Sequence, residues 1–149
     1  MKMLGKFWRL RMINATGSTM TYDTATHGAR IAIRCMPWKI TSGELAYGTV
    51  ITEDLGFSAG EIIVDDGEVE GEVVNNGANL YFGMAGTFEV KHDLDAASGD
   101  CKLYLEYADA DGNWPSDTND FEITDLILLV TLPIENTDVG RSRSVNFEI

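Results

Sequence analysis

The sequence predicts an all-β fold, a single antiparallel β-sandwich or jelly-roll-like domain with short hairpins. Glycine occurs 15 times in 149 residues, so few stretches are long enough to form an uninterrupted helix. Short runs in which apolar and polar residues alternate recur along the chain. Turn signals rich in Gly, Asp, Asn and Ser separate these runs at intervals of about eight to twelve residues, which is typical of antiparallel sandwiches and barrels.

The first two expected strands are basic and half-buried. In residues 8–12, three apolar side chains alternate with Arg9 and Arg11, and residues 31–35 repeat the pattern around Arg34. Because successive side chains of a strand point to opposite faces, we expect the apolar set to face the core. The three arginines are then expected to display their charge outward.

The next two segments differ sharply in polarity. Residues 61–75 carry five acidic side chains in their first ten positions and few large apolar ones, which predicts an exposed hairpin or edge strand. Residues 80–90 alternate most cleanly, and their large apolar side chains, from Leu80 to Val90, are expected to share one face.

Two further strands are expected in the C-terminal half. Residues 101–107 alternate, whereas residues 126–132 are apolar at both phases, which predicts a central strand covered on both faces. Cys35 and Cys101 both lie in apolar alternating runs. Two cysteines are too few for a disulfide framework, so we expect buried free thiols.

Charge is divided unevenly along the chain. Residues 1–41 contain seven basic side chains and one acidic one, a net of +6, whereas residues 42–149 contain four basic and 23 acidic ones, a net of −19. Such a chain is suited to setting one surface against another, within its own fold or across a contact with a neighbour. No break in composition accompanies the change of sign, so residues 1–149 are expected to form one domain.

Several function classes are disfavoured. A sequence pI near 4.3 makes a nucleic-acid partner unexpected, because phosphate binding requires a basic face. No apolar run approaches the roughly 20 residues of a membrane span, and the basic start is too short in apolar residues for a signal peptide. We therefore expect no membrane partner, and synthesis and folding in a cytoplasm. Because no nucleophile elbow, phosphate loop or metal-spaced histidine pair occurs, we expect neither an enzyme nor a cofactor.

An acidic loop is the best candidate for binding a metal. Asp109, Asp111, Asp117 and Asp120 place four carboxylates within twelve residues, and oxygen ligands suit calcium. However, Gly112 is the fourth residue of the loop, whereas an EF-hand needs glycine at the sixth. An Asp-Gly turn in a hairpin explains the same residues, so the sequence predicts no metal site and leaves these four as a weak calcium candidate.

Three aromatic residues lie close together in the sequence around this loop. Trp114, with Tyr104 and Tyr107, is suited to form a platform that stacks on a sugar ring. Aromatic residues of this kind also pack over loops or lie at protein contacts, and the sequence leaves both interpretations open.

In the C-terminal half, an expected strand with Leu103-Tyr104-Leu105-Glu106 leads into a loop with Asp111-Gly112-Asn113-Trp114-Pro115. In this arrangement, a Leu-Tyr-Leu-Glu strand followed by an Asp-Gly-x-Trp-Pro loop, the chain resembles a class of small bacteriophage virion proteins. The resemblance covers roughly residues 80–149, about half of the chain. It rests on Lys102-Leu103-Tyr104-Leu105-Glu106, on Asp109 to Asp120 with Asp111-Gly112-Asn113-Trp114-Pro115, and on Phe121, Arg141-Ser142 and Phe147. It implies a structural or accessory role beside capsid or tail proteins and a β-sandwich-like fold.

Our interpretation is a non-enzymatic virion structural protein that decorates the capsid (head decoration) or joins tail and fibre components. Its expected partners are other virion proteins and further copies of itself. The expected contact residues are Trp8, Arg9, Arg11, Arg34 and Trp114. The alternative is a carbohydrate-binding β-sandwich module with an aromatic platform near Trp114.

Overall fold

The computed structural model describes residues 4–21, 30–53, 62–91, 98–109, 111–117, 126–135 and 141–149. In these residues the regular elements are β-strands and one short 3-10 helix, η1 (Pro115–Asp117). The predicted all-β, sandwich-like fold class is confirmed. None of the helical structure in the described part of the chain is long and apolar enough to cross a membrane.

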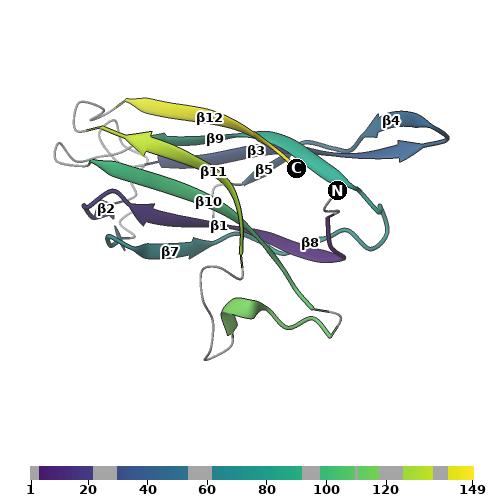
Figure 1. Cartoon of the computed structure of the whole chain (residues 1–149), viewed down its shortest axis with the longest axis horizontal. Coiled ribbons are helices and arrows are strands. Elements are labelled where there is room, and N and C mark those ends of the chain that lie inside the picture. The colour runs from purple at the N-terminus through teal and green to yellow at the C-terminus, as the bar shows by residue number, and fades with distance from the viewer. Residues whose placement is uncertain are drawn as a thin grey trace.

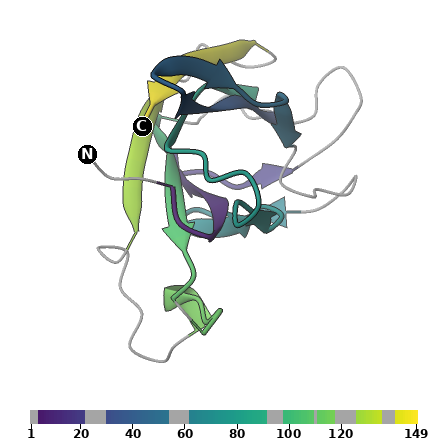
Figure 2. The ribbon, with the colours of Figure 1, turned by 90° about the vertical axis from the view of Figure 1, so that its right-hand side faces the viewer.

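Two antiparallel sheets form the layers of the sandwich, as Figures 1 and 2 show from two directions. The sheet called here the β1 sheet has the order β11-β10-β1-β7, and β8 also pairs with β1. Its strands are β11 (Ile127–Ile134), β10 (Gly99–Tyr107), β1 (Phe7–Ala15), β7 (Gly67–Glu70) and β8 (Val74–Asn75).

The opposite layer, called here the β3 sheet, has the order β12-β9-β3-β4, and β5 also pairs with β3. Its strands are β12 (Ser142–Glu148), β9 (Gly83–Lys91), β3 (Arg30–Thr41), β4 (Glu44–Tyr47) and β5 (Ile51–Glu53). A small third sheet pairs β2 (Met20–Thr21) with β6 (Ile62–Ile63).

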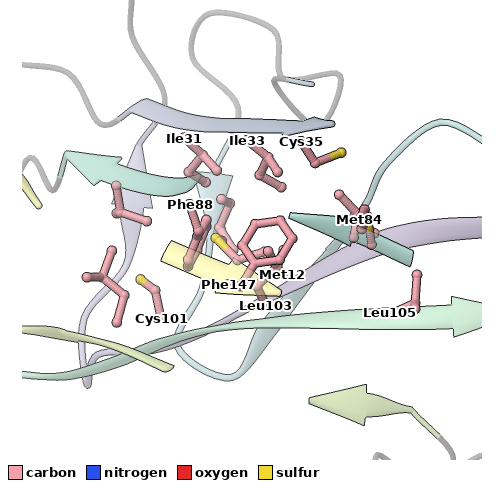
Figure 3. Packing of buried hydrophobic residues seen from close by; sticks show 14 of the residues in the cluster. Met12, Ile31, Ile33, Cys35, Met84, Phe88, Cys101, Leu103, Leu105 and Phe147 are labelled. Atoms are coloured by element: carbon pink, nitrogen blue, oxygen red, sulfur yellow. The ribbon is translucent and has the colours of Figure 1, made fainter. Parts of the chain in front are cut away.

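The hydrophobic core fills the space between the two layers (Figure 3). The alternation predicted for residues 8–12 and 31–35 is confirmed, because Leu10, Met12 and Ile33 are fully buried there. Burying one such side chain stabilises the fold by about 1.5–3 kcal/mol. The core residues that Figure 3 labels are Met12, Ile31, Ile33, Cys35, Met84, Phe88, Cys101, Leu103, Leu105 and Phe147. Both cysteines are buried free thiols, as predicted.

The strand expected over residues 80–90 begins later than predicted. β9 starts at Gly83, and Met84, Phe88 and Val90 enter the core. Leu80 precedes the strand and is 66% exposed, and its backbone φ of 51° lies in the left-handed region, outside strand geometry. The expectation that Leu80 shares the buried face is therefore wrong.

The strand expected over residues 126–132 is not central. β11 lies at the end of the β1 sheet, and Leu128 is exposed. Leu103 is opposite Val130 and Tyr104 is opposite Leu128, so Leu129 is one extra residue in the ladder. Beyond this β-bulge the other set of alternating side chains faces the core. Both sets therefore contain apolar residues.

The acidic segment lies at the opposite edge of the β1 sheet, which confirms the predicted edge position. β7 is the last strand in the sheet order, and it pairs with β1 alone among the described strands. Its glutamates alternate along the strand, so Glu68 and Glu70 lie on one face.

Candidate functional site

A cluster of charged side chains lies on the outer face of the β1 sheet. Leu10 of β1 points into the core, so its neighbours Arg9 and Arg11 point to the opposite face. The strand register places Arg9 opposite Glu106 of β10 and Arg11 opposite Glu70 of β7. With Glu68, these residues form what we call the charged cluster: Arg9, Arg11, Glu68, Glu70 and Glu106.

The expectation that Arg9 and Arg11 display their charge is wrong. Arg9 is 8% exposed and Arg11 is 3% exposed, because carboxylates from both neighbouring strands surround them. Arg9 Nη1 lies 2.7 Å from Glu70 Oε2, and Arg9 Nε lies 2.7 Å from Glu106 Oε2. Arg11 forms ion pairs with Glu68 and Glu70. The basic strand is thus neutralised by its own acidic neighbours.

Glu106 is the central acceptor of the cluster, and only 1% of it is exposed. It accepts hydrogen bonds from Arg9 Nε at 2.7 Å and from the Ser116 backbone N–H at 2.9 Å. Burial by itself raises the pKa of Glu106, but the hydrogen bonds from Ser116 and Arg9 and the charge of Arg9 outweigh it. The pKa of Glu106 therefore lies below its usual value, and the carboxylate stays ionised at neutral pH.

The charged cluster also fastens the loop that follows β10. This Trp114 loop, residues 108–109 and 111–117, lies on the outer side of the β1 sheet in Figures 1 and 2. Arg9 Nη2 donates a hydrogen bond to Ser116 Oγ at 2.7 Å, and the Arg9 guanidinium lies 4.4 Å from the centre of the Trp114 ring. A cation–π contact of this kind contributes about 0.5–2 kcal/mol. Trp114 is half-buried as a result.

The five expected contact residues do not form one surface. Arg9, Arg11 and Trp114 come together, but Trp8 is buried in the core and is not available for a contact. Arg34 is exposed, as expected, yet it lies on β3 in the other sheet.

Glu106 was not singled out from the sequence, although it matters most to this site. The alternation of residues 101–107 places Glu106 on the side opposite the core. The alternation does not tell which residue of β1 lies opposite Glu106. Only the strand register places this carboxylate beside Arg9.

The acidic loop is organised as a turn. Asp109 Oδ1 accepts hydrogen bonds from the backbone N–H groups of Asp111 and Asn113, at 2.9 and 2.8 Å, and Asp109 Oδ2 accepts one from Asn113 Nδ2. The hydrogen bonds from Asn113 are the main cause of a lowered pKa at Asp109. Gly112 has a φ of 89°, which glycine adopts readily. This geometry agrees with the Asp-Gly turn that the sequence suggested.

Not all four calcium candidates lie among the described residues. Asp120, Phe121 and the side chain of Asp117 lie outside the described residues. Among the residues that the structure describes, no group of three or more His, Cys, Asp or Glu side chains is placed to hold a metal ion.

The three aromatic residues expected to form a platform are divided between two places. Tyr104 is buried in a small outer cluster with Ile13 and Leu126. Tyr107 and Trp114 line a common cavity of about 240 Å³ beside Asp109. Burial raises the pKa of Tyr107 to about 12, so its phenol stays neutral.

Comparisons of the chain with protein-family models, with curated proteins and with solved structures gave no match. The fold and the site geometry therefore define the class, an all-β, sandwich-like domain with a loop fastened over one outer face by a buried ion-pair cluster.

Proposed function

We propose that this chain is a non-enzymatic structural protein of a bacteriophage virion, which decorates the capsid or joins tail and fibre components through protein contacts. The resemblance of residues 80–149 motivates the class. One observation carries the proposal furthest: the loop with the resembling residues Asp111-Gly112-Asn113-Trp114-Pro115 is anchored to the sheet through Arg9 and Glu106. Tryptophan is one of the residue types enriched among those that dominate the energy of protein contacts.

The chemistry of the charged cluster favours a structural role over a catalytic one. Both carboxylate oxygens of Glu106 already accept hydrogen bonds, from Arg9 and from Ser116. A general acid or base needs a pKa near the working pH, whereas the pKa of Glu106 is lowered. The cluster is therefore better suited to holding the Trp114 loop than to moving protons.

Mass spectrometry and cryo-EM of purified particles test the proposal. The chain is expected among the virion proteins, and its absence from the particle would overturn the proposal. Head decoration predicts hundreds of copies per particle, whereas a role between tail and fibre predicts about a dozen or fewer, because such joints follow low-order symmetry.

A carbohydrate-binding module is the second candidate, and one observation favours it. Tyr107 and Trp114 line the same cavity of about 240 Å³, next to the carboxylate of Asp109. Glycan-array binding that is lost in Trp114→Ala, with an unchanged circular dichroism spectrum, would support this candidate. Absence of binding both with and without calcium would remove it.

A further inference from the structure

One hairpin carries an apolar stripe on the outside of the molecule. β3 and β4 pair with Trp38 opposite Tyr47 and Ile40 opposite Leu45, so these four side chains share one face. Ile40, Leu45 and Tyr47 are 52%, 54% and 59% exposed. We call residues 38–47 the arm and these four side chains its stripe. Figure 1 shows the arm extending beyond the body of the sandwich.

The other face of the arm contacts the loop of residues 76–82 in the same chain. Lys39 lies on the side opposite the stripe, where its Nζ donates to the backbone carbonyl of Asn79 at 3.0 Å and lies 5.4 Å from the centre of the Tyr81 ring. The stripe therefore points away from residues 76–82, and the chain does not cover it with this loop.

An apolar pocket of about 430 Å³ lies in this neighbouring loop. Leu4, Leu80 and Phe82 form apolar walls, and exposed Lys6 adds a positive charge. The volume falls within the range of about 300–1,000 Å³ that is typical of binding pockets.

The pocket loop holds Leu80 in a conformation that leucine rarely adopts, with a φ of 51°. Buried Asn76 fixes this geometry, since its carbonyl accepts the Leu80 N–H at 2.9 Å and its Nδ2 donates to the Tyr81 carbonyl at 3.0 Å. Such backbone strain is found at binding sites. An exposed leucine held this way beside a pocket therefore points to a contact with another molecule.

We propose that two copies of this chain exchange arms, so that the stripe of each enters the pocket of the other. Charge complementarity selects a second copy as the occupant, because exposed Glu44 at the arm tip carries the charge opposite to Lys6. The arm, the start of β1 and β8 lie toward the same end of the sandwich (Figure 1). A two-fold axis at that end gives two equivalent contacts and a closed dimer. The inference concerns self-association alone and does not depend on a place in a virion.

Charge-swap variants of the full chain test the exchange by sedimentation equilibrium and native mass spectrometry. Glu44→Lys alone and Lys6→Glu alone each put like charges at both contacts, so the dimer dissociation constant is expected to rise at least about tenfold. In a mixture of the two variants, every heterodimer has one native pair and one reversed pair. The mixture is therefore expected to recover dimers that neither variant forms well.

Two further variants complete the design. Leu45→Asp is expected to abolish the dimer, because it places a charge in the stripe. Glu89→Lys, at an exposed position of β9 outside the arm and the pocket, changes net charge as Glu44→Lys does and is expected to leave the dimer intact.

Three results would overturn the proposal. One is a monomeric wild-type chain at concentrations up to about 0.1 mM. The second is dimerisation of Glu44→Lys and Lys6→Glu at wild-type affinity, which would mean that the arm does not contact the pocket beside Lys6. The third is a mixture that associates no better than its components.

Discussion

Replacing Glu106 with glutamine removes one negative charge from the charged cluster and keeps nearly the same side-chain volume. In the wild-type protein, one carboxylate oxygen accepts from Arg9 Nε and the other accepts from the Ser116 backbone N–H. The amide of glutamine retains one acceptor oxygen and turns an NH₂ donor toward the second donor. Arg9 then keeps Glu70 as its remaining carboxylate among these contacts.

The size of the effect follows from burial. Removing one partner of a buried ion pair costs about 3–5 kcal/mol, because the remaining charge stays buried without compensation. Glu70 lies 2.7 Å from Arg9 and its side chain is 44% exposed, so part of the compensation persists. We therefore expect Glu106→Gln to lower the free energy of unfolding by about 3 kcal/mol, the low end of that range.

Urea unfolding, followed by tryptophan fluorescence and by circular dichroism, measures this loss. With a typical urea dependence, the midpoint is expected to fall by about 1–3 M. Glu68→Gln is the matched control, because the Glu68 side chain is 36% exposed and Arg11 keeps its ion pair with Glu70, so this variant is expected to cost clearly less than Glu106→Gln. If the two variants lose stability equally within about 0.5 kcal/mol, the argument from burial is refuted.

Three further predictions concern acid, the loop and the thiols. Because the pKa of Glu106 is lowered in the folded protein, its stabilising effect is complete above the ordinary carboxyl pKa and is lost as pH falls through the lowered value. The stability difference between wild type and Glu106→Gln should thus stay constant from about pH 7 down to about the ordinary carboxyl pKa and shrink below it, and a difference that stays constant in acid would contradict the assignment. Trp114→Ala should cost about 1–2 kcal/mol and speed hydrogen exchange at the Ser116 amide; unaltered exchange there would mean that Trp114 does not hold the loop. Burial raises the pKa of Cys101 to about 12, and Cys35 is also buried, so both thiols should resist a thiol reagent at neutral pH until the protein unfolds. Rapid labelling of the native protein would count against this burial.

Local patterns predicted the local structure well. Alternation over residues 8–12 and 31–35 identified two strands and their buried faces, because side chains of a strand alternate whatever the strand pairs with. The turn at Asp109 was also predictable, since Asp109 is bonded to residues at most four positions away.

Features that depend on pairing were not predictable in this way. The bulge at Leu129 appears only when β11 is set against β10, so the apolar run by itself predicts a central strand where the fold has an edge strand. The exposed arm follows from β3 and β4 extending beyond the strands that β9 and β5 supply, which no local pattern records.

The sequence by itself determined the uneven charge, a basic first 41 residues against an acidic remainder, and the side of the first strand on which its arginines lie. The tertiary structure decided what those arginines meet. Arg9 and Glu106 are 97 residues apart in the chain and 2.7 Å apart in the fold. Ion pairs of this kind depend on strand register, so folding turned two arginines that were expected to face solvent into an internal anchor for the Trp114 loop.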